Sequence, residues 1–221
     1  MRTYCTVFAL LFLAVSGLQA GVIFSDNFDS GASAQWGNQV GSWAASGGVY
    51  DATSPSTTPD ARSLLPFNLS DFEVDVDTTQ IGDGGVWLRA TNAPGTTVGA
   101  TGVLLVISPD QDDIYWYVVT DGSSYGSPIN SASLSPKTHS YRIIVSGNVY
   151  SVFVAPQPTA RTTLTTSAFS SGLTGLSDFQ ADGFDNFVLT DDSGVPEPAT
   201  FGLAALGLGL LALARQRLRK A

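Results

Sequence analysis

Residues 72–78 read FEVDVDT, an alternation of apolar and acidic side chains that is typical of a β-strand with one buried and one wet face. The apolar set is Phe72, Val74 and Val76, and the acidic set is Glu73, Asp75 and Asp77. Side chains two residues apart on a strand point to the same side. The sequence therefore predicts three carboxylates in a row on the solvent face of one strand.

The rest of the central region shows the signs of further short strands. Val, Thr, Ser, Gly and aromatic residues dominate it, and no stretch has sustained helical periodicity. The other predicted strands are residues 85–90, 102–108, 114–120, 141–146 and 149–154. Gly147 and Asn148 tolerate the positive φ of a two-residue turn, which predicts a hairpin between the last two. We expect an all-β, two-sheet sandwich.

The first 20 residues have the features of a secretory signal peptide. Arg2 precedes an apolar run over residues 7–15 that is too short to span a bilayer, and small residues lead up to Ala20. We expect export by the Sec translocon and cleavage by signal peptidase after Ala20. The single cysteine, Cys5, lies in this segment, so the mature protein cannot form a disulfide.

The C-terminal segment, residues 195–221, has three parts. Pro196-Glu197-Pro198 forces an extended stretch, because proline fixes its own φ and biases the preceding residue away from helix. A helix is predicted over the apolar residues 199–214, about 24 Å long and therefore shorter than a hydrocarbon core of ~30 Å. The basic end consists of Arg215, Arg217, Arg219 and Lys220, which would hold this terminus on the cytoplasmic side of the inner membrane.

In this order, the Pro-Glu-Pro step, the short Gly/Leu/Ala span and the arginine-rich end closely resemble the PEP-CTERM sorting signal of Gram-negative bacteria. The resemblance implies recognition by an exosortase, removal of the span, and delivery of the domain to the cell surface or extracellular matrix. In such families the trait accompanies exopolysaccharide production. An ordinary single-span anchor is the alternative interpretation.

Residues 21–194 remain between the two ends and have the size of one domain. Five basic residues oppose 18 acidic ones in this range, a net charge of −13. A surface this acidic repels nucleic-acid phosphates, which excludes DNA or RNA as a partner. Such a surface favours solubility, strong hydration and the binding of divalent cations instead.

Three short patterns lie near the start, middle and end of this domain. They are FSDNFD at residues 24–29, DFEVDV at 71–76 followed by GGVWLR at 84–89, and GFDNFV at 183–188. Together they resemble concanavalin A-like jelly rolls, including laminin-G-like domains and the 3-keto-disaccharide hydrolase family. In that fold the first and last strands lie side by side, which implies that the first and last patterns are neighbours.

The carboxylate row admits a catalytic alternative. Glu73, Asp75 and Asp77 resemble the Glu-x-Asp-x-Glu strand of laminarinase-type glycoside hydrolases, in which one carboxylate attacks the sugar and another is the acid/base. Asp77 departs from that pattern, since its side chain is one methylene shorter than that of glutamate. A solvated strand face explains the row without catalysis, and we favour a protein that is not an enzyme.

Asp26, Asp29 and Asp185 are candidate ligands for a structural calcium ion. The implied pairing of the end strands would bring them together, and Ca²⁺ takes oxygen ligands. The acidic run from Asp110 to Asp113 is a rival that a solvated loop also explains. The chain has a single histidine, His139, which argues against a transition metal. We expect no other cofactor.

Aromatic side chains are candidate platforms for sugar rings, with polar groups at the rim. The candidates are Trp87, Arg89, Tyr115, Trp116 and Tyr117. Strand alternation sends Trp116 to one face and both tyrosines to the other, and it places Trp87 and Arg89 on a shared face. Packing in the sandwich core is the alternative for each ring.

These features lead to one leading hypothesis and two alternatives. The leading hypothesis is an exported surface or matrix protein whose sandwich binds or coats extracellular polysaccharide without catalysis. The first alternative is a glycan-active hydrolase of the same fold that uses Glu73 with Asp75 or Asp77. The second is a purely structural adhesin.

Overall fold

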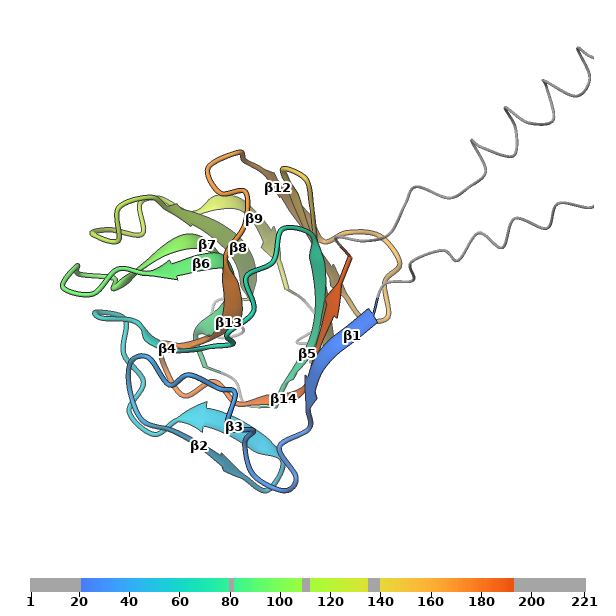
Figure 1. The fold of residues 1–221 in the computed structure, drawn as a ribbon. Coiled ribbons are helices and arrows are strands. Elements are labelled where there is room, and N and C mark those ends of the chain that lie inside the picture. Colours follow the sequence, from blue (N-terminus) through green and yellow to red (C-terminus); the bar gives the residue numbers. More distant parts are fainter. Residues whose placement is uncertain (1–20, 80–81, 109–111, 135–139, 193–221) are drawn as a thin grey trace, which may run out of the picture. The chain divides into compact units, whose positions relative to one another are not determined.

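Two antiparallel sheets packed face to face form the part of the chain that the computed structural model describes, residues 21–79, 82–108, 112–134 and 140–192 (Figure 1). One sheet has eight strands in the order β12-β11-β10-β5-β14-β3-β2, and β1 also pairs with β14. The other has six strands in the order β4-β13-β6-β7-β8-β9. All these residues belong to one compact unit, Ala20–Ser193. The predicted all-β, two-sheet sandwich is confirmed.

The strand bounds are as follows. The eight-stranded sheet contains β1 (Gly21–Asp26), β2 (Trp43–Ser46), β3 (Val49–Ala52), β5 (Phe72–Thr78), β10 (Ser140–Ser146), β11 (Val149–Val154), β12 (Thr162–Thr165) and β14 (Phe184–Asp191). The six-stranded sheet contains β4 (Ala61–Leu64), β6 (Gly84–Asn92), β7 (Ala100–Ser108), β8 (Asp113–Val119), β9 (Ile129–Ser133) and β13 (Leu173–Asp178).

β5 is the strand that the alternating sequence predicts, and it lies between β10 and β14. Phe72, Val74 and Val76 are at most 1% exposed, whereas the carboxylates between them are half-buried. The remaining predicted strands are confirmed as β6, β7, β8, β10 and β11. The predicted hairpin is confirmed as well, since Ser146 pairs with Val149 and Gly147 has a φ of 53°.

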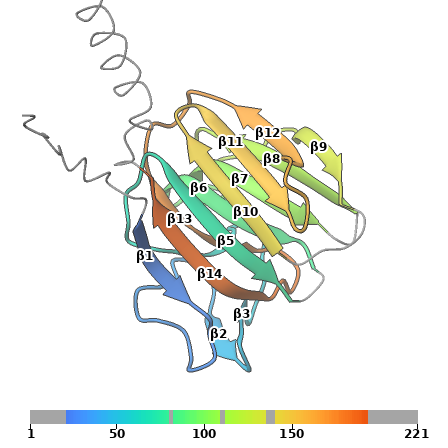
Figure 2. The ribbon, with the colours of Figure 1, turned by 90° about the vertical axis from the view of Figure 1, so that its right-hand side faces the viewer.

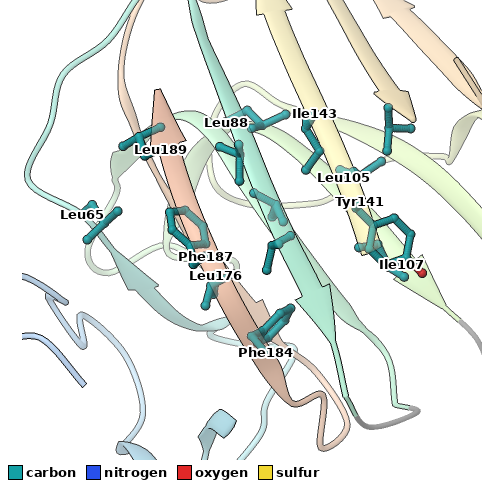
Figure 3. Packing of buried hydrophobic residues seen from close by; sticks show 14 of the residues in the cluster. Leu65, Leu88, Leu105, Ile107, Tyr141, Ile143, Leu176, Phe184, Phe187 and Leu189 are labelled. Carbon is teal, nitrogen blue, oxygen red and sulfur yellow. The ribbon is translucent and has the colours of Figure 1, made fainter. Parts of the chain in front are cut away.

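The main hydrophobic core lies between the two sheets (Figure 3). β14 contributes Phe187 and Leu189, and β10 contributes Ile143. Leu88 of β6 and Leu105 of β7 meet them from the six-stranded sheet. Each of these side chains is fully buried, which stabilises the fold by about 1.5–3 kcal/mol per residue relative to exposure.

The first and last strands of the described chain lie side by side, as the jelly-roll resemblance implies (Figure 2). β1 runs antiparallel to β14, with Gly21 opposite Asp191 and Asp26 opposite Phe187. The two Asp-Asn-Phe elements are therefore neighbours. This pairing also brings both ends of the described chain to the same end of β14.

Within the described residues, no helix has the length and apolar character needed to cross a bilayer. The predicted signal peptide, residues 1–20, and the predicted span, residues 199–214, lie outside these residues. The same holds for the Pro196-Glu197-Pro198 step and for the basic end.

Candidate functional site

The outer face of the eight-stranded sheet carries the predicted carboxylate row. Because Phe72, Val74 and Val76 point into the core, Glu73, Asp75 and Asp77 point outward from β5. Figure 2 looks onto this side of the molecule, with β10, β5 and β14 adjacent to one another. The three carboxylates thus share one accessible sheet face.

A groove of ≈ 550 Å³ crosses this face where β5 ends and β10 begins, and we call it the Asp77 groove. Its lining residues are Asp75, Val76, Asp77, Ser140, Tyr141, Arg142, Phe153, Ala155, Pro156, Gln157, Pro158 and Asn186. Its outward side chains comprise two carboxylates, two side-chain amides, one cation and the Phe153 ring, whereas the Tyr141 ring belongs to the core. Glu73 lies one step along the strand, outside the lining.

An aromatic ring and a guanidinium make up part of the groove lining. Across the strands, Asp75 pairs with Arg142, and Arg142 pairs with Phe153. The Cζ atom of Arg142 lies 5.0 Å from the centre of the Phe153 ring, which is a cation–π distance. No described carboxylate comes within 4.0 Å of this guanidinium. The half-buried ring and the exposed cation therefore form one amphipathic platform.

Asn186 occupies the middle of the face because the backbone of β14 is irregular there. The pairing of β14 with β5 shifts between Asp185 and Val188, and Asn186 has a φ of 50°. Asparagine is among the residues that tolerate this left-handed conformation, and such bulges re-aim side chains. The Nδ2 atom of Asn186 donates a 2.9 Å hydrogen bond to Oδ2 of Asp77. The bulge thereby fixes one oxygen of the Asp77 carboxylate.

A second hollow of ≈ 340 Å³ continues the face beyond Asn186. It is lined by Ser25, Asp26, Asn27, Asn186, Phe187 and Val188. Because Asn186 lines both, the Asp77 groove and this second hollow meet at that residue. Together they cross β11, β10, β5, β14 and β1, roughly perpendicular to the strands.

Two carboxyl groups of the row influence each other. Burial raises the pKa of Glu73, the negative charge of Asp75 raises it further, and Arg142 opposes these effects. Burial also raises the pKa of Asp75, against the opposing effects of Arg142 and of a hydrogen bond from the Glu73 carboxyl. The two groups therefore hold a proton more readily than separate solvated carboxylates would.

The predicted sugar platforms Trp87 and Trp116 are wrong, because both rings are fully buried. Trp116 lies in the core between the sheets and donates from Nε1 to Oγ1 of Thr162 at 3.3 Å. Trp87 lies in a second cluster on the other side of the six-stranded sheet, where its Nε1 donates to the Asp60 carboxylate. Both aromatic residues fill cores instead of contacting solvent.

Arg89 is buried as well, at 2% exposure, and the predicted face shared with Trp87 is wrong. The pairing of β6 with β7 shifts between Leu88 and Thr91, and Arg89 has a φ of 48°. This bulge breaks the alternation, so Arg89 packs over the Tyr150 ring of the inter-sheet core, 5.2 Å from its centre.

Tyr115 and Tyr117 point to the side opposite Trp116, as strand alternation predicts. They are in edge contact, with ring centres 5.4 Å apart, and Tyr125 and Phe179 extend the row. Tyr115 is 9% exposed and Tyr117 is half-buried. They lie on the six-stranded sheet, so neither contributes to the Asp77 groove, and their contact with glycan stays a prediction.

The three predicted calcium ligands do not come together. Backbone and indole N–H groups of Phe28, Ser33 and Trp36 already donate to the Asp26 carboxylate. Asp29 accepts from Asn27, and Asp185 accepts from the backbone of Asn186. In the part of the chain that the structure describes, no group of three or more His, Cys, Asp or Glu residues could hold a metal ion. Asp110 and His139 lie outside that part.

Sequence reasoning missed Arg142, Phe153, Asn186 and Gln157 as site residues. Arg142 and Phe153 occupy the outward positions of predicted strands, so their exposure could have been predicted. Their proximity could not, because it depends on the β10–β11 and β5–β10 registers. The position of Asn186 depends on a β-bulge that no local sequence pattern predicts.

Comparison with protein families identifies the C-terminal tail. The model of the PEP-CTERM protein-sorting motif matches residues 194–220. The chain carries a PEP-CTERM sorting motif. The predicted resemblance of this tail is thereby confirmed, and the PEP-CTERM motif implies exosortase processing and sorting toward the cell surface.

Comparison with solved structures supports the fold of the domain. A carbohydrate-binding module, CBM66 from Bacillus subtilis, is 18% identical with a TM-score of 0.54, covering 71% of this chain and 92% of that one. A candidate glycosyl hydrolase from Parabacteroides distasonis is 17% identical with a TM-score of 0.51, covering 78% and 99%. A Bacillus subtilis protein of unknown function with a galectin-like fold is 10% identical with a TM-score of 0.50, covering 77% and 96%. A search of curated sequences finds no match. The domain that precedes the PEP-CTERM motif thus has a lectin-like jelly-roll fold.

Proposed function

We propose that this is an exported surface or extracellular-matrix protein of a Gram-negative bacterium that binds exopolysaccharide without catalysis. Its partners would be the Sec translocon and signal peptidase during export, then the inner membrane and an exosortase during sorting. The jelly-roll domain would hold the polysaccharide in the Asp77 groove.

The observation that carries this proposal is the platform of Arg142 and Phe153 between polar side chains. Sugars have an apolar ring face that packs on aromatic groups and hydroxyls that need hydrogen-bond partners. The groove provides the Phe153 ring for the first and Asp75, Asp77, Asn186 and Gln157 for the second. A similar fold in a named carbohydrate-binding module is consistent with this use.

The test is a glycan array with the purified full-length chain in detergent, followed by affinity measurements on bound glycans. We expect binding that weakens by up to about tenfold in Phe153→Ala, since aromatic contacts are worth roughly 0.5–1.5 kcal/mol. Ile144→Ala is the matched control, because Ile144 lies half-buried on the same sheet face and does not line the groove. Absence of any bound glycan, or equal effects of both variants, would overturn the proposal.

A glycan-active hydrolase is the second candidate, and the carboxylate row is the observation that favours it. Glu73 and Asp75 share one face and influence each other's ionisation, as acid/base pairs do. Release of reducing sugar that Glu73→Gln abolishes would establish this activity. Binding without release supports the non-catalytic function, and neither binding nor release points to a structural adhesin.

A further inference from the structure

The charges around the Asp77 groove restrict the polysaccharides that it can hold. Asp75 and Asp77 line the groove, and Glu73 and Asp185 are close neighbours along the paired strands β5 and β14. Arg142 is the lining cation, and its guanidinium lies against the Phe153 ring. Negative charge therefore exceeds positive charge at this part of the surface.

The remainder of the domain reinforces this imbalance. Of its five basic residues, Arg62 and Arg89 are buried and donate to backbone carbonyls, and Lys137 lies outside the described residues. Arg142 and Arg161 are the exposed cations among the described residues. Polyanions therefore meet a repulsive field before they reach the groove.

The groove also leaves acidic acceptor oxygens available for a ligand. Asn186 binds Oδ2 of Asp77, which fixes the carboxylate and leaves Oδ1 for another donor. Asp75 lies in the same cross-strand row as Phe153, with Arg142 between them, about 10 Å away across two strand spacings. An oligosaccharide with one ring packed on Phe153 would thus cross β10 and bring the substituents of its next sugar near the two carboxylates of β5. Hydrogen bonds from a cationic donor to carboxylates are stronger than those from a neutral hydroxyl.

We propose that the Asp77 groove prefers a polysaccharide whose sugars carry free amino groups and rejects polymers of uronic acids. This inference rests on the proposed function and assigns its ligand a chemical class. An ammonium group of one sugar would pair with Asp77 or Asp75 while a neighbouring ring of the chain packs on Phe153. It would also relieve the mutual repulsion of the carboxylates along β5, where burial raises the pKa of Glu73 and the charge of Asp75 raises it further.

The test compares three soluble probes on the purified full-length chain in a slightly acidic, low-salt buffer. They are glucosamine oligosaccharides, their fully N-acetylated counterparts and alginate oligosaccharides. We expect glucosamine oligosaccharides to bind about tenfold more tightly than the acetylated ones, with the preference shrinking as salt rises. Alginate should bind most weakly of the three.

Paired variants separate a local effect from general attraction to an acidic protein. Asp75→Asn/Asp77→Asn should abolish the preference for the amine and retain binding of the acetylated probe. Asp113→Asn/Asp121→Asn is the matched control, since it removes the same charge from β8 and the following loop, outside the groove. It should retain the preference.

The outcomes distinguish the two proposals. Equal binding of aminated and acetylated probes, tight binding of alginate, or an unchanged preference in Asp75→Asn/Asp77→Asn would overturn this inference and leave glycan binding intact. Binding of no probe and of no glycan on the array would overturn the proposed function itself, and this inference with it.

Discussion

Asp71 and Arg89 form an ion pair with 3.3 Å between Oδ1 and Nη2, and this pair joins the two sheets. Asp71 directly precedes β5 of the eight-stranded sheet, whereas Arg89 belongs to β6 of the six-stranded sheet. The same Oδ1 accepts a 2.7 Å hydrogen bond from the backbone of Gly147, in the turn between β10 and β11. A single carboxylate thus connects both sheets and the turn between β10 and β11.

Arg89 should matter far more for stability than Asp71. Its guanidinium also donates to the carbonyl oxygens of Ser70 and Phe169, each at 2.8 Å, and it is 2% exposed. Arg89→Ala leaves these two half-buried acceptors without partners and empties the space of a fully buried side chain, and we expect a loss of about 3–5 kcal/mol in the free energy of unfolding. The Asp71 side chain is 37% exposed, so Asp71→Asn should cost less than ~1 kcal/mol.

Urea-induced unfolding of both variants and the parent protein measures this difference. Arg142→Ala is the control, because Arg142 is exposed and makes no described ion pair. Similar losses in Arg89→Ala and Arg142→Ala would show that the buried guanidinium does not hold the sheets together.

Asp60 should make the domain lose stability as the pH rises. The side chain is fully buried, with Ser177 donating to Oδ1 at 2.6 Å and Trp87 donating to the other oxygen. Burial raises the pKa of Asp60 from 3.8 to about 7. The folded state therefore binds a proton that the unfolded chain has already lost. This contribution to stability is complete below pH 3.8 and disappears as the pH rises to about 7.

Asp60→Asn should remove this dependence, because an amide cannot ionise and its oxygen still accepts hydrogen bonds. Asp178, whose pKa burial raises to about 6, acts in the same direction. As the pH rises from 6 to 7, the parent should therefore lose stability and Asp60→Asn should not. As the pH rises from 4 to about 6, both proteins should lose stability, because Asp178 titrates in both. The contribution of the Asp60 proton to the free energy of unfolding is on the order of 4 kcal/mol at low pH.

Thermal unfolding of the parent and of Asp60→Asn between pH 4 and pH 7 tests this prediction, with the exposed Asp121→Asn as control. Parallel curves for parent and Asp60→Asn would contradict it.

Strands with a regular alternation could be predicted from the sequence, and β5 shows why. One of its faces is fully buried and the other meets solvent, so its pattern has a period of two. β6 and β7 were predictable from their apolar runs. β2, β4 and β12 have four residues each, too few for a period to be recognised.

The candidate site was less predictable because irregular pairing creates much of it. Bulges at Arg89 and Asn186 redirect side chains that strict alternation would place elsewhere. The buried tryptophans illustrate a second difficulty. Both faces of β6 and β8 are covered, one by the opposite sheet and one by the second cluster, so an outward position on these strands does not imply exposure.

The PEP-CTERM motif should be required for release of the domain from the membrane. Pro196→Ala/Pro198→Ala replaces two residues that disfavour helix by one that favours it, so we expect the exosortase to recognise the altered motif poorly. We expect this variant to stay in the membrane fraction with residues 201–221 attached, as intact mass spectrometry would show. Pro128→Ala, in an exposed loop of the domain, should be processed like the parent. Equal processing of both variants would count against a role for the prolines.

The junction at Asn186 should make affinity depend on glycan length. The Asp77 groove and the second hollow cross five neighbouring strands, a distance of about 19 Å at 4.8 Å per strand. A short oligosaccharide can occupy only the groove, whereas a longer one also reaches Asn27 in the second hollow. Calorimetric titration with glucosamine oligosaccharides of increasing length should therefore show affinity that rises and then levels off.

Two variants test the contribution of each hollow. Asn27→Ala should weaken the binding of long oligosaccharides severalfold and leave the binding of short ones unaffected, because Asn27 lines the second hollow alone. Asn186→Gly allows the same positive φ and removes the side-chain amide that lines both hollows, so it should weaken the binding of short and long oligosaccharides alike. Affinity that is independent of length would mean that a ligand uses the groove alone.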